Sequence, residues 1–161
     1  MIEFLSKGGI LMIPIFICSI IAVGIILERA YCFWKESKGL QKFIDYLQNL
    51  ENKKEILKTG SQKVRLLEKN LRGLAVIANV TPLLGLLGTV FGMIKAFIVI
   101  QNLGGGVDAS VLAGGIWEAL LTTAAGLSVA IPTSLFYHYF EGKADGIAIL
   151  IKETVREKIE H

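Results

Sequence analysis

Three long uncharged runs constrain this chain more than any other feature. They cover residues 8–27, 73–94 and 119–140, which are 20, 22 and 22 residues long. About 20 apolar residues in a helix cross the ~30 Å hydrocarbon core of a bilayer. Charged residues make up only 19% of the chain and its mean hydropathy is +0.57, so a soluble domain is not expected. We predict an all-α integral membrane protein with three transmembrane helices.

The first run could instead be a secretory signal. It is longer than the usual apolar region of a signal, no A-x-A site closes it, and Ile17 before Cys18 is too bulky for a lipoprotein cleavage site. We therefore predict a permanent span. Cys18 and Cys32 would lie about 21 Å apart on one continuous helix, so we expect two free thiols.

Lysine and arginine are concentrated on one side of the predicted spans. Residues 28–72 and 141–161 carry 15 of them, whereas the opposite side carries two, Lys7 in the head and Lys95 at the end of the second span. Nucleic-acid binding is an alternative reason for such a bias, but the positive-inside rule explains it more simply. The basic segments are therefore predicted to be cytoplasmic, with a periplasmic N-terminus and a cytoplasmic C-terminus.

The predicted order of segments follows from these spans. It comprises a periplasmic head with the first span (1–27), a cytoplasmic helical loop (28–72), a second span (73–96), a short periplasmic link (97–117), a third span (118–140) and a cytoplasmic helical tail (141–161). Within the loop we expect a turn near Thr59-Gly60-Ser61, and within the link a turn at Gly104-Gly105-Gly106.

Apolar residues at helical spacing are expected to hold the loop and the tail together. In the loop these residues are Leu40, Phe43, Ile44 and Leu47, and in the tail they are Ile147, Leu150, Ile151, Val155 and Ile159. Such a stripe indicates a helix with one buried face. The tail stripe is predicted to pack against the loop helices or against neighbouring subunits.

Small residues form a stripe along each of the last two spans. The stripe of the second span contains Gly85, Thr89, Gly92 and Ala96, with a further small pair at Gly88 and Gly92, and that of the third contains Ala119, Thr123, Gly126, Ala130 and Ser134. Small side chains let helix backbones approach closely within a membrane. Both stripes are therefore predicted to face protein.

Thr89 and Thr123 place a hydroxyl in each stripe. Both would lie about 6–8 Å inside the outer membrane boundary, and antiparallel helices would bring them to the same depth. They could bond their own helix or only aid packing. The one acid at this border, Glu118, could equally be a solvated helix N-terminus or a partner of Lys95.

The chain shows no pattern of enzymatic chemistry. No metal-ligand cluster, phosphate-binding loop or catalytic triad can be assembled, so we expect no catalytic residues, no metal, no cofactor and no enzyme. The interiors of the three spans also lack an ionisable carrier. If the protein conducts protons, the carrier group deep in the membrane is expected to come from another chain.

Two stretches resemble the signature spans of the MotA/TolQ/ExbB proton-channel family. They are TPLLGLLGTVFGM (81–93) and GIWEALLTTAAGLSVAIP (115–132), and the three-span order is most similar to ExbB and TolQ. The resemblance implies a bacterial inner-membrane ring of five copies around an ExbD/TolR-type partner whose single span carries an ion-binding aspartate. It also implies that ion flow drives a TonB-type or TolA-type protein.

The same resemblance assigns roles to residues of the stripes. Thr89 and Thr123 would face the pore, and Glu118 would lie near its entrance. The residues expected to pack around the partner are Gly85, Gly88, Gly92, Gly126 and Ala130.

Two departures from the family leave alternatives open. The cytoplasmic loop is shorter than in the better-known members, and Thr122 adds a hydroxyl where alanine is common, so a sodium-driven variant competes with a proton-driven one. A structural scaffold, in which glycines and threonines only pack helices, is the alternative from another functional class. The residues do not separate a Ton-type task from a Tol-type task.

Overall fold

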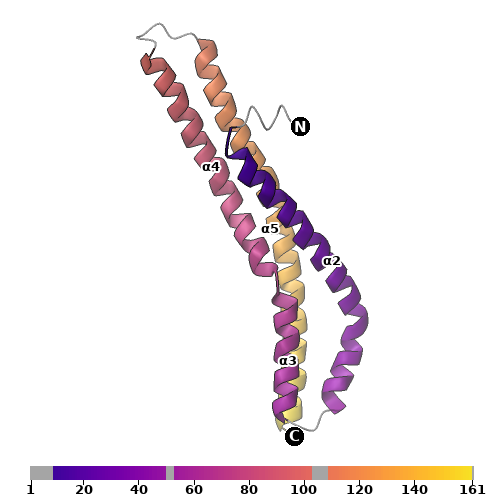
Figure 1. The fold of residues 1–161 in the computed structure, drawn as a ribbon. Helices are drawn as coiled ribbons and strands as arrows, with labels where there is room; N and C mark the ends of the chain where they lie inside the picture. Colours follow the sequence, from indigo (N-terminus) through magenta and orange to yellow (C-terminus); the bar gives the residue numbers. More distant parts are fainter. Residues whose placement is uncertain (1–8, 50–52, 103–108, 161) are drawn as a thin grey trace. The chain divides into compact units, whose positions relative to one another are not determined.

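The computed structural model describes residues 9–49, 53–102 and 109–160, and its described elements are all α-helices (Figure 1). The helices are α2 (Met12–Asn49), α3 (Lys53–Glu68), α4 (Leu71–Asn102) and α5 (Ala109–Glu160). Three stretches of the described chain are apolar and long enough to cross a membrane: Met12–Lys35, Lys54–Asn102 and Leu112–Glu157. The predicted all-α class with three candidate spans is confirmed.

The helices reach further than the segment order suggested. α4 continues to Asn102 and α5 begins at Ala109, so helix takes up much of the segment expected to be a link. The turn predicted at Gly104-Gly105-Gly106 lies outside the described residues, as does most of the N-terminal head.

The described chain forms two compact units. The first unit combines the described parts of Met1–Val23 and Ala75–Ser134, and the second combines Gly24–Leu74 with Leu135–His161. In the first unit, α4 and α5 run side by side in opposite directions and meet along their small residues. Both stripes were predicted to face protein, and within this chain they face each other.

The second unit has its own apolar core. Leu47, Ile56, Ile151 and Val155 are buried in it, and Phe43, Val64 and Ile147 pack against them. The predicted packing of the tail against the loop is therefore confirmed for Ile147, Ile151 and Val155. Leu150 is 46% exposed and does not pack on the loop of its own chain, so for this residue the alternative of a neighbouring subunit stays a prediction. The side chains of Leu40 and Ile159 lie outside the described residues.

The turn predicted near Thr59-Gly60-Ser61 is wrong, because α3 passes through these residues without a break. Gly60 is buried instead. A Cβ at this position would lie 3.2 Å from a methyl of Ile151 and 3.3 Å from a methyl of Val155. The glycine thus serves a close approach of α3 to α5, a use that a sequence pattern does not distinguish from a turn.

A buried arginine stabilises the junction of α3 and α4. The Arg29 side chain donates to the carbonyl oxygens of Leu66 and Leu67, each at 3.2 Å, and pairs with Glu28 at 3.0 Å. It therefore satisfies carbonyls near the C-terminal end of α3 that lack partners within the helix.

Asn70 makes the turn itself. Its φ of 67° lies in the left-handed region, which asparagine tolerates better than most residues. Its amide donates to Glu28 at 2.6 Å, so Glu28 contacts both Arg29 and Asn70. A short polar network thus fixes the α3–α4 junction.

Aromatic residues contribute to the packing of the second unit. Phe33 and Phe140 are buried and stack with ring centroids 5.5 Å apart, whereas Tyr31 and Tyr139 are exposed. Both cysteines are free, as predicted.

Candidate functional site

The small-residue seam of α4 and α5 is the candidate site. A Cβ on Gly85 would lie 3.1 Å from the Cα of Thr123, and one on Gly126 would lie 2.8 Å from the carbonyl oxygen of Thr81. Next to them, a Cβ on Gly92 would lie 2.9 Å from the Cβ of Ala119. Real Cβ contacts are longer than this, so these glycines let the two backbones approach closely.

Thr122 fills the notch left by Gly88. A Cβ on Gly88 would lie 2.6 Å from both the Cβ and the Cγ2 of Thr122. Thr122 is only 1% exposed, and its hydroxyl donates to the carbonyl oxygen of Glu118 at 2.5 Å. The side chain is therefore an interhelical packing residue whose polar atom bonds its own helix.

The two candidate pore threonines bond different carbonyls. The hydroxyl of Thr123 crosses to α4 and donates to Gly85 at 2.9 Å. The hydroxyl of Thr89 bonds its own helix at Leu86, at 2.6 Å. Gly85 lies one turn from Thr89, so the threonines lie within about 6 Å in depth, as expected for antiparallel helices. The structure does not join their hydroxyls, and the pore-facing role of each stays a prediction.

Glu118 lies near the end of this seam and forms an ion pair. Its carboxylate is 2.7 Å from the ammonium of Lys95. The alternative of a solvated helix N-terminus is wrong, because α5 begins nine residues earlier, at Ala109. The other alternative, an ion pair with Lys95, is the one that the structure shows. Because Lys95 is more than half exposed, the pair itself contributes little to stability.

The start of α2 closes over this ion pair. Gly9 has a φ of 70° and its carbonyl accepts a hydrogen bond from the amide of Met12. A Cβ on Gly9 would lie 2.1 Å from the Glu118 carboxylate. Glycine is therefore required here both for the backbone conformation and for the approach of the carboxylate.

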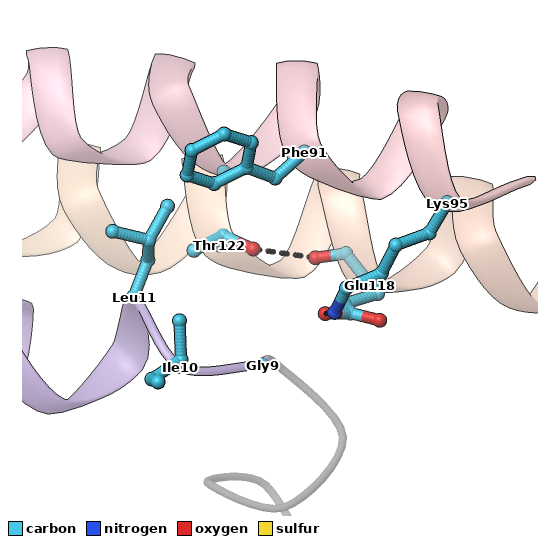
Figure 2. A pocket seen from close by; sticks show the side chains of 8 residues that line it. Gly9, Ile10, Leu11, Phe91, Lys95, Glu118 and Thr122 are labelled. Carbon is cyan, nitrogen blue, oxygen red and sulfur yellow. Dashed lines mark hydrogen bonds and ion pairs between the residues drawn. The ribbon is translucent and has the colours of Figure 1, made fainter.

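A small cavity lies among these elements (Figure 2). Its volume is about 60 Å³, enough for a few water molecules. Figure 2 shows Phe91 and Leu11 over one side of it, while Thr122, Lys95 and Glu118 supply polar groups. Among the described residues, this cavity could hold water at one end of the α4–α5 seam.

The chemistry of the seam is that of a passive wall. From residue 73 to 94 and from 119 to 140 the chain has no Asp, Glu, Lys or Arg. Threonine does not titrate near neutral pH, so its hydroxyl can donate or accept a hydrogen bond, or help to coordinate a cation, but cannot carry the proton itself. Within the residues that the structure describes, no group of three His, Cys, Asp or Glu side chains could hold a metal ion.

The residues that were expected to pack around a partner make contacts within this chain. The sides of Gly85, Gly88, Gly92 and Gly126 that need to be small face the opposite helix of the same pair, and Ala130 is buried. Packing of these residues around a partner stays a prediction.

Sequence reasoning missed the packing role of Thr122 and the contact of Gly9. Thr122 was considered only as an extra hydroxyl. The expected register, with Thr89 and Thr123 at the same depth, does not by itself place Gly88 opposite Thr122, so the notch had no sequence signal beyond the small residue Gly88. For Gly9 the sequence offers no signal, since a glycine before a span has many uses.

Comparison with known proteins identifies relatives over most of the chain. Residues 36–153 match the sequence model of the MotA/TolQ/ExbB proton channel family. This match includes α3, α4 and most of α5, and hence the whole seam described above.

Several individual proteins are similar. The biopolymer transport protein ExbB of Helicobacter pylori is 35% identical over 80% of this chain and 77% of its own length. A Synechocystis sp. protein named as ExbB-like 1 is 32% identical over 80% of this chain, which covers 65% of that protein. The biopolymer transport protein exbB1 of Vibrio cholerae is 48% identical over 38% of this chain and 27% of its own length. The chain thus spans less than two thirds of the last two relatives.

Proposed function

The chain belongs to the MotA/TolQ/ExbB proton channel family and is ExbB-like, and on that premise we propose that it is the ring-forming subunit of an ion-driven motor of the bacterial inner membrane. Copies of the chain, five by analogy with the family, would surround the single span of an ExbD/TolR-type partner. The motor would energise a TonB-type or TolA-type protein. Each unit charge that crosses releases about 2.3 kcal/mol per 100 mV, so several crossings would be needed for mechanical work.

The observation that carries the proposal is the placement of charge along the seam. Lys95 and Glu118 lie toward one end of it and neutralise each other, and residues 73–94 and 119–140 contain no Asp, Glu, Lys or Arg; their one histidine, His138, lies at the far end, beside Glu141. A proton that crosses the membrane needs a titratable group or a continuous water path at depth. The proposal therefore assigns the carrier carboxylate to the partner and the wall around it to this chain.

In this proposal Thr89 and Thr123 line the path, and Glu118 lies at its periplasmic mouth. Hydroxyl oxygens keep lone pairs after they donate a hydrogen bond, so both threonines could still accept one from a protonated carboxyl or from water. The cavity beside Glu118 and Thr122 supports water at this end.

The test is ion flux into liposomes under an imposed pH gradient and potential. The protein is reconstituted alone and with its single-span partner, and the same assay is run for Thr123→Ala and Thr123→Ser. We expect flux only with the partner, retained in Thr123→Ser and lost in Thr123→Ala. The control is Ser128→Ala, which removes an exposed hydroxyl that bonds Ala124 of its own helix.

Each other outcome points to a different function. Flux from this protein alone would replace the motor with a simple channel, because no partner carboxylate would be needed. Unchanged flux in both Thr123→Ala and Thr89→Val would favour the scaffold alternative, in which the hydroxyl of Thr123 only joins α5 to α4. Flux that follows a sodium gradient at constant pH would identify the sodium-driven variant.

A further inference from the structure

The second unit carries an open groove between α3 and the C-terminal part of α5. Its volume is about 510 Å³. The apolar side chains in its lining include Leu57, Val64 and Val155, its basic side chains are Arg65, Lys152 and Arg156, and no carboxylate lines it. The groove thus combines apolar walls with positive charge.

Exposure of the apolar side chains of this groove to water is unfavourable. α3 carries seven charged side chains among its 16 residues, so this helix is built for an aqueous surface. Leu57 is nevertheless 52% exposed at the groove. A contiguous apolar surface with a polar rim typically marks a site of protein association.

The opposite side of α5 presents a face with complementary properties. We define this outer face by Gly142, Gly146, Ile149, Leu150, Glu153 and Glu157, all of which are exposed. A Cβ on Gly142 or on Gly146 would meet nothing within 4 Å. Ile149 is 55% exposed and Leu150 46% exposed, and both ionisable side chains of the face are acidic. The outer face is thus small, apolar and negative.

The apolar wall of the groove and the outer face lie on opposite sides of α5, whereas Arg156 at the rim of the groove lies about 20° from Ile149 of the outer face. Gly146 of the outer face and Val155 of the groove are nine residues apart, which is a rotation of about 180° at 3.6 residues per turn. A copy whose outer face sits in a neighbour's groove therefore keeps its own groove open for the next copy. Contacts of this head-to-tail kind generate rings or filaments and do not close as two-fold dimers.

We infer that the groove receives the outer face of α5 from a second copy of this chain. Ile149 and Leu150 would then cover the apolar wall, Glu153 and Glu157 would approach the basic rim, and the glycines would allow α5 to enter closely. A two-fold pairing of groove with groove would bring the basic rims together, which is unfavourable. The inference deepens the ring of the proposed function and depends on it, but it does not depend on ion conduction.

The first test is cross-linking between differently tagged full-length copies. Cys18 and Cys32 are replaced by serine, one copy carries Leu57→Cys in the groove, and the other carries Leu150→Cys on the outer face. A short bis-maleimide is expected to join these copies, and to join Leu57→Cys poorly to copies with Gly39→Cys, which lies on α2. An oligomer that forms without the 57–150 cross-link, or that cross-links 57 to 57, overturns the inference.

The second test is native mass in detergent. Gly146→Leu should fold normally, because the space around it is open within one chain, but it should fail to assemble. Gly39→Leu is the matched control, since a Cβ there also meets nothing within 4 Å. An unchanged native mass for Gly146→Leu would refute the docking.

Charge reversal tests the complementarity of the two surfaces. Arg65→Glu and Glu157→Arg should each weaken assembly by roughly tenfold, and the double variant should restore it. Since these residues lie on α3 and on the far side of α5, rescue would act between copies. A double variant as weak as the single variants would contradict the inference.

The outcomes separate this inference from the proposed function. A wild-type protein that is monomeric at all concentrations overturns both the ring and the docking. A wild-type protein that conducts ions with its partner, but gives no 57–150 cross-link, overturns only the docking.

Discussion

The notch between Gly88 and Thr122 gives the sharpest test of the α4–α5 seam. In Gly88→Ala the new Cβ would lie 2.6 Å from the Cβ of Thr122, whereas ordinary contacts are 3.4–4 Å. The helices would have to separate by nearly 1 Å, because the Cβ of a threonine cannot rotate away. Overpacking of this kind costs about 1–3 kcal/mol, which corresponds to about 2–4 °C in melting temperature per kcal/mol.

The assay is thermal unfolding in one detergent, with Gly114→Ala as the control. Gly114 is also helical, but a Cβ there meets nothing within 4 Å, so the comparison cancels the intrinsic helix preference of alanine. We expect Gly88→Ala to melt below Gly114→Ala. A second change of Thr122 to glycine should restore stability, whereas Thr122→Ala should restore it only in part, because its Cβ remains. Equal melting of Gly88→Ala and Gly114→Ala would refute the notch.

Other predictions concern the second unit and the ion pair. Arg29→Met should lower the free energy of unfolding by about 1.5–3 kcal/mol, since it leaves two carbonyls at the end of α3 without their charged donor; an unchanged melting temperature would contradict this capping role. Gly60→Leu should loosen α3 from α5 and speed proteolysis within α3, whereas the exposed Gly146→Leu should not affect it. Lys95→Met should change stability by less than about 1 kcal/mol, because its pair with Glu118 is partly exposed, and a larger loss would mean that the pair orders the start of α2.

The spans and the helix faces that contact protein could be predicted from the sequence for a physical reason. A bilayer demands a run of about 20 uncharged residues, and close helix contact in lipid demands small side chains at regular spacing. Both requirements produce a regular pattern of residue types along the sequence. Gly85 and Thr123, chosen from that pattern, do meet in the structure.

Contacts between segments that are far apart in the chain produce no such sequence pattern. Gly60 resembled a turn because glycine permits both turns and close packing, and only the position of Ile151 decides between them. Arg29 resembled one more positive charge beside a membrane, yet it is 4% exposed and serves the end of α3, 37 residues away. Glu118 resembled the start of a helix because a nearby run of glycines suggested a long link.

Thr122 shows how packing limits what the seam can do chemically. Its extra hydroxyl raised the alternative of sodium, since a cation prefers oxygen ligands. In the structure that hydroxyl is buried and donates to Glu118, and its carbons fill the notch at Gly88. Because this hydroxyl is buried and already donates to the carbonyl oxygen of Glu118, it does not by itself favour sodium. The selectivity of the proposed path therefore depends on the surfaces that α4 and α5 present outside their seam, and on the carboxylate that the partner brings to them.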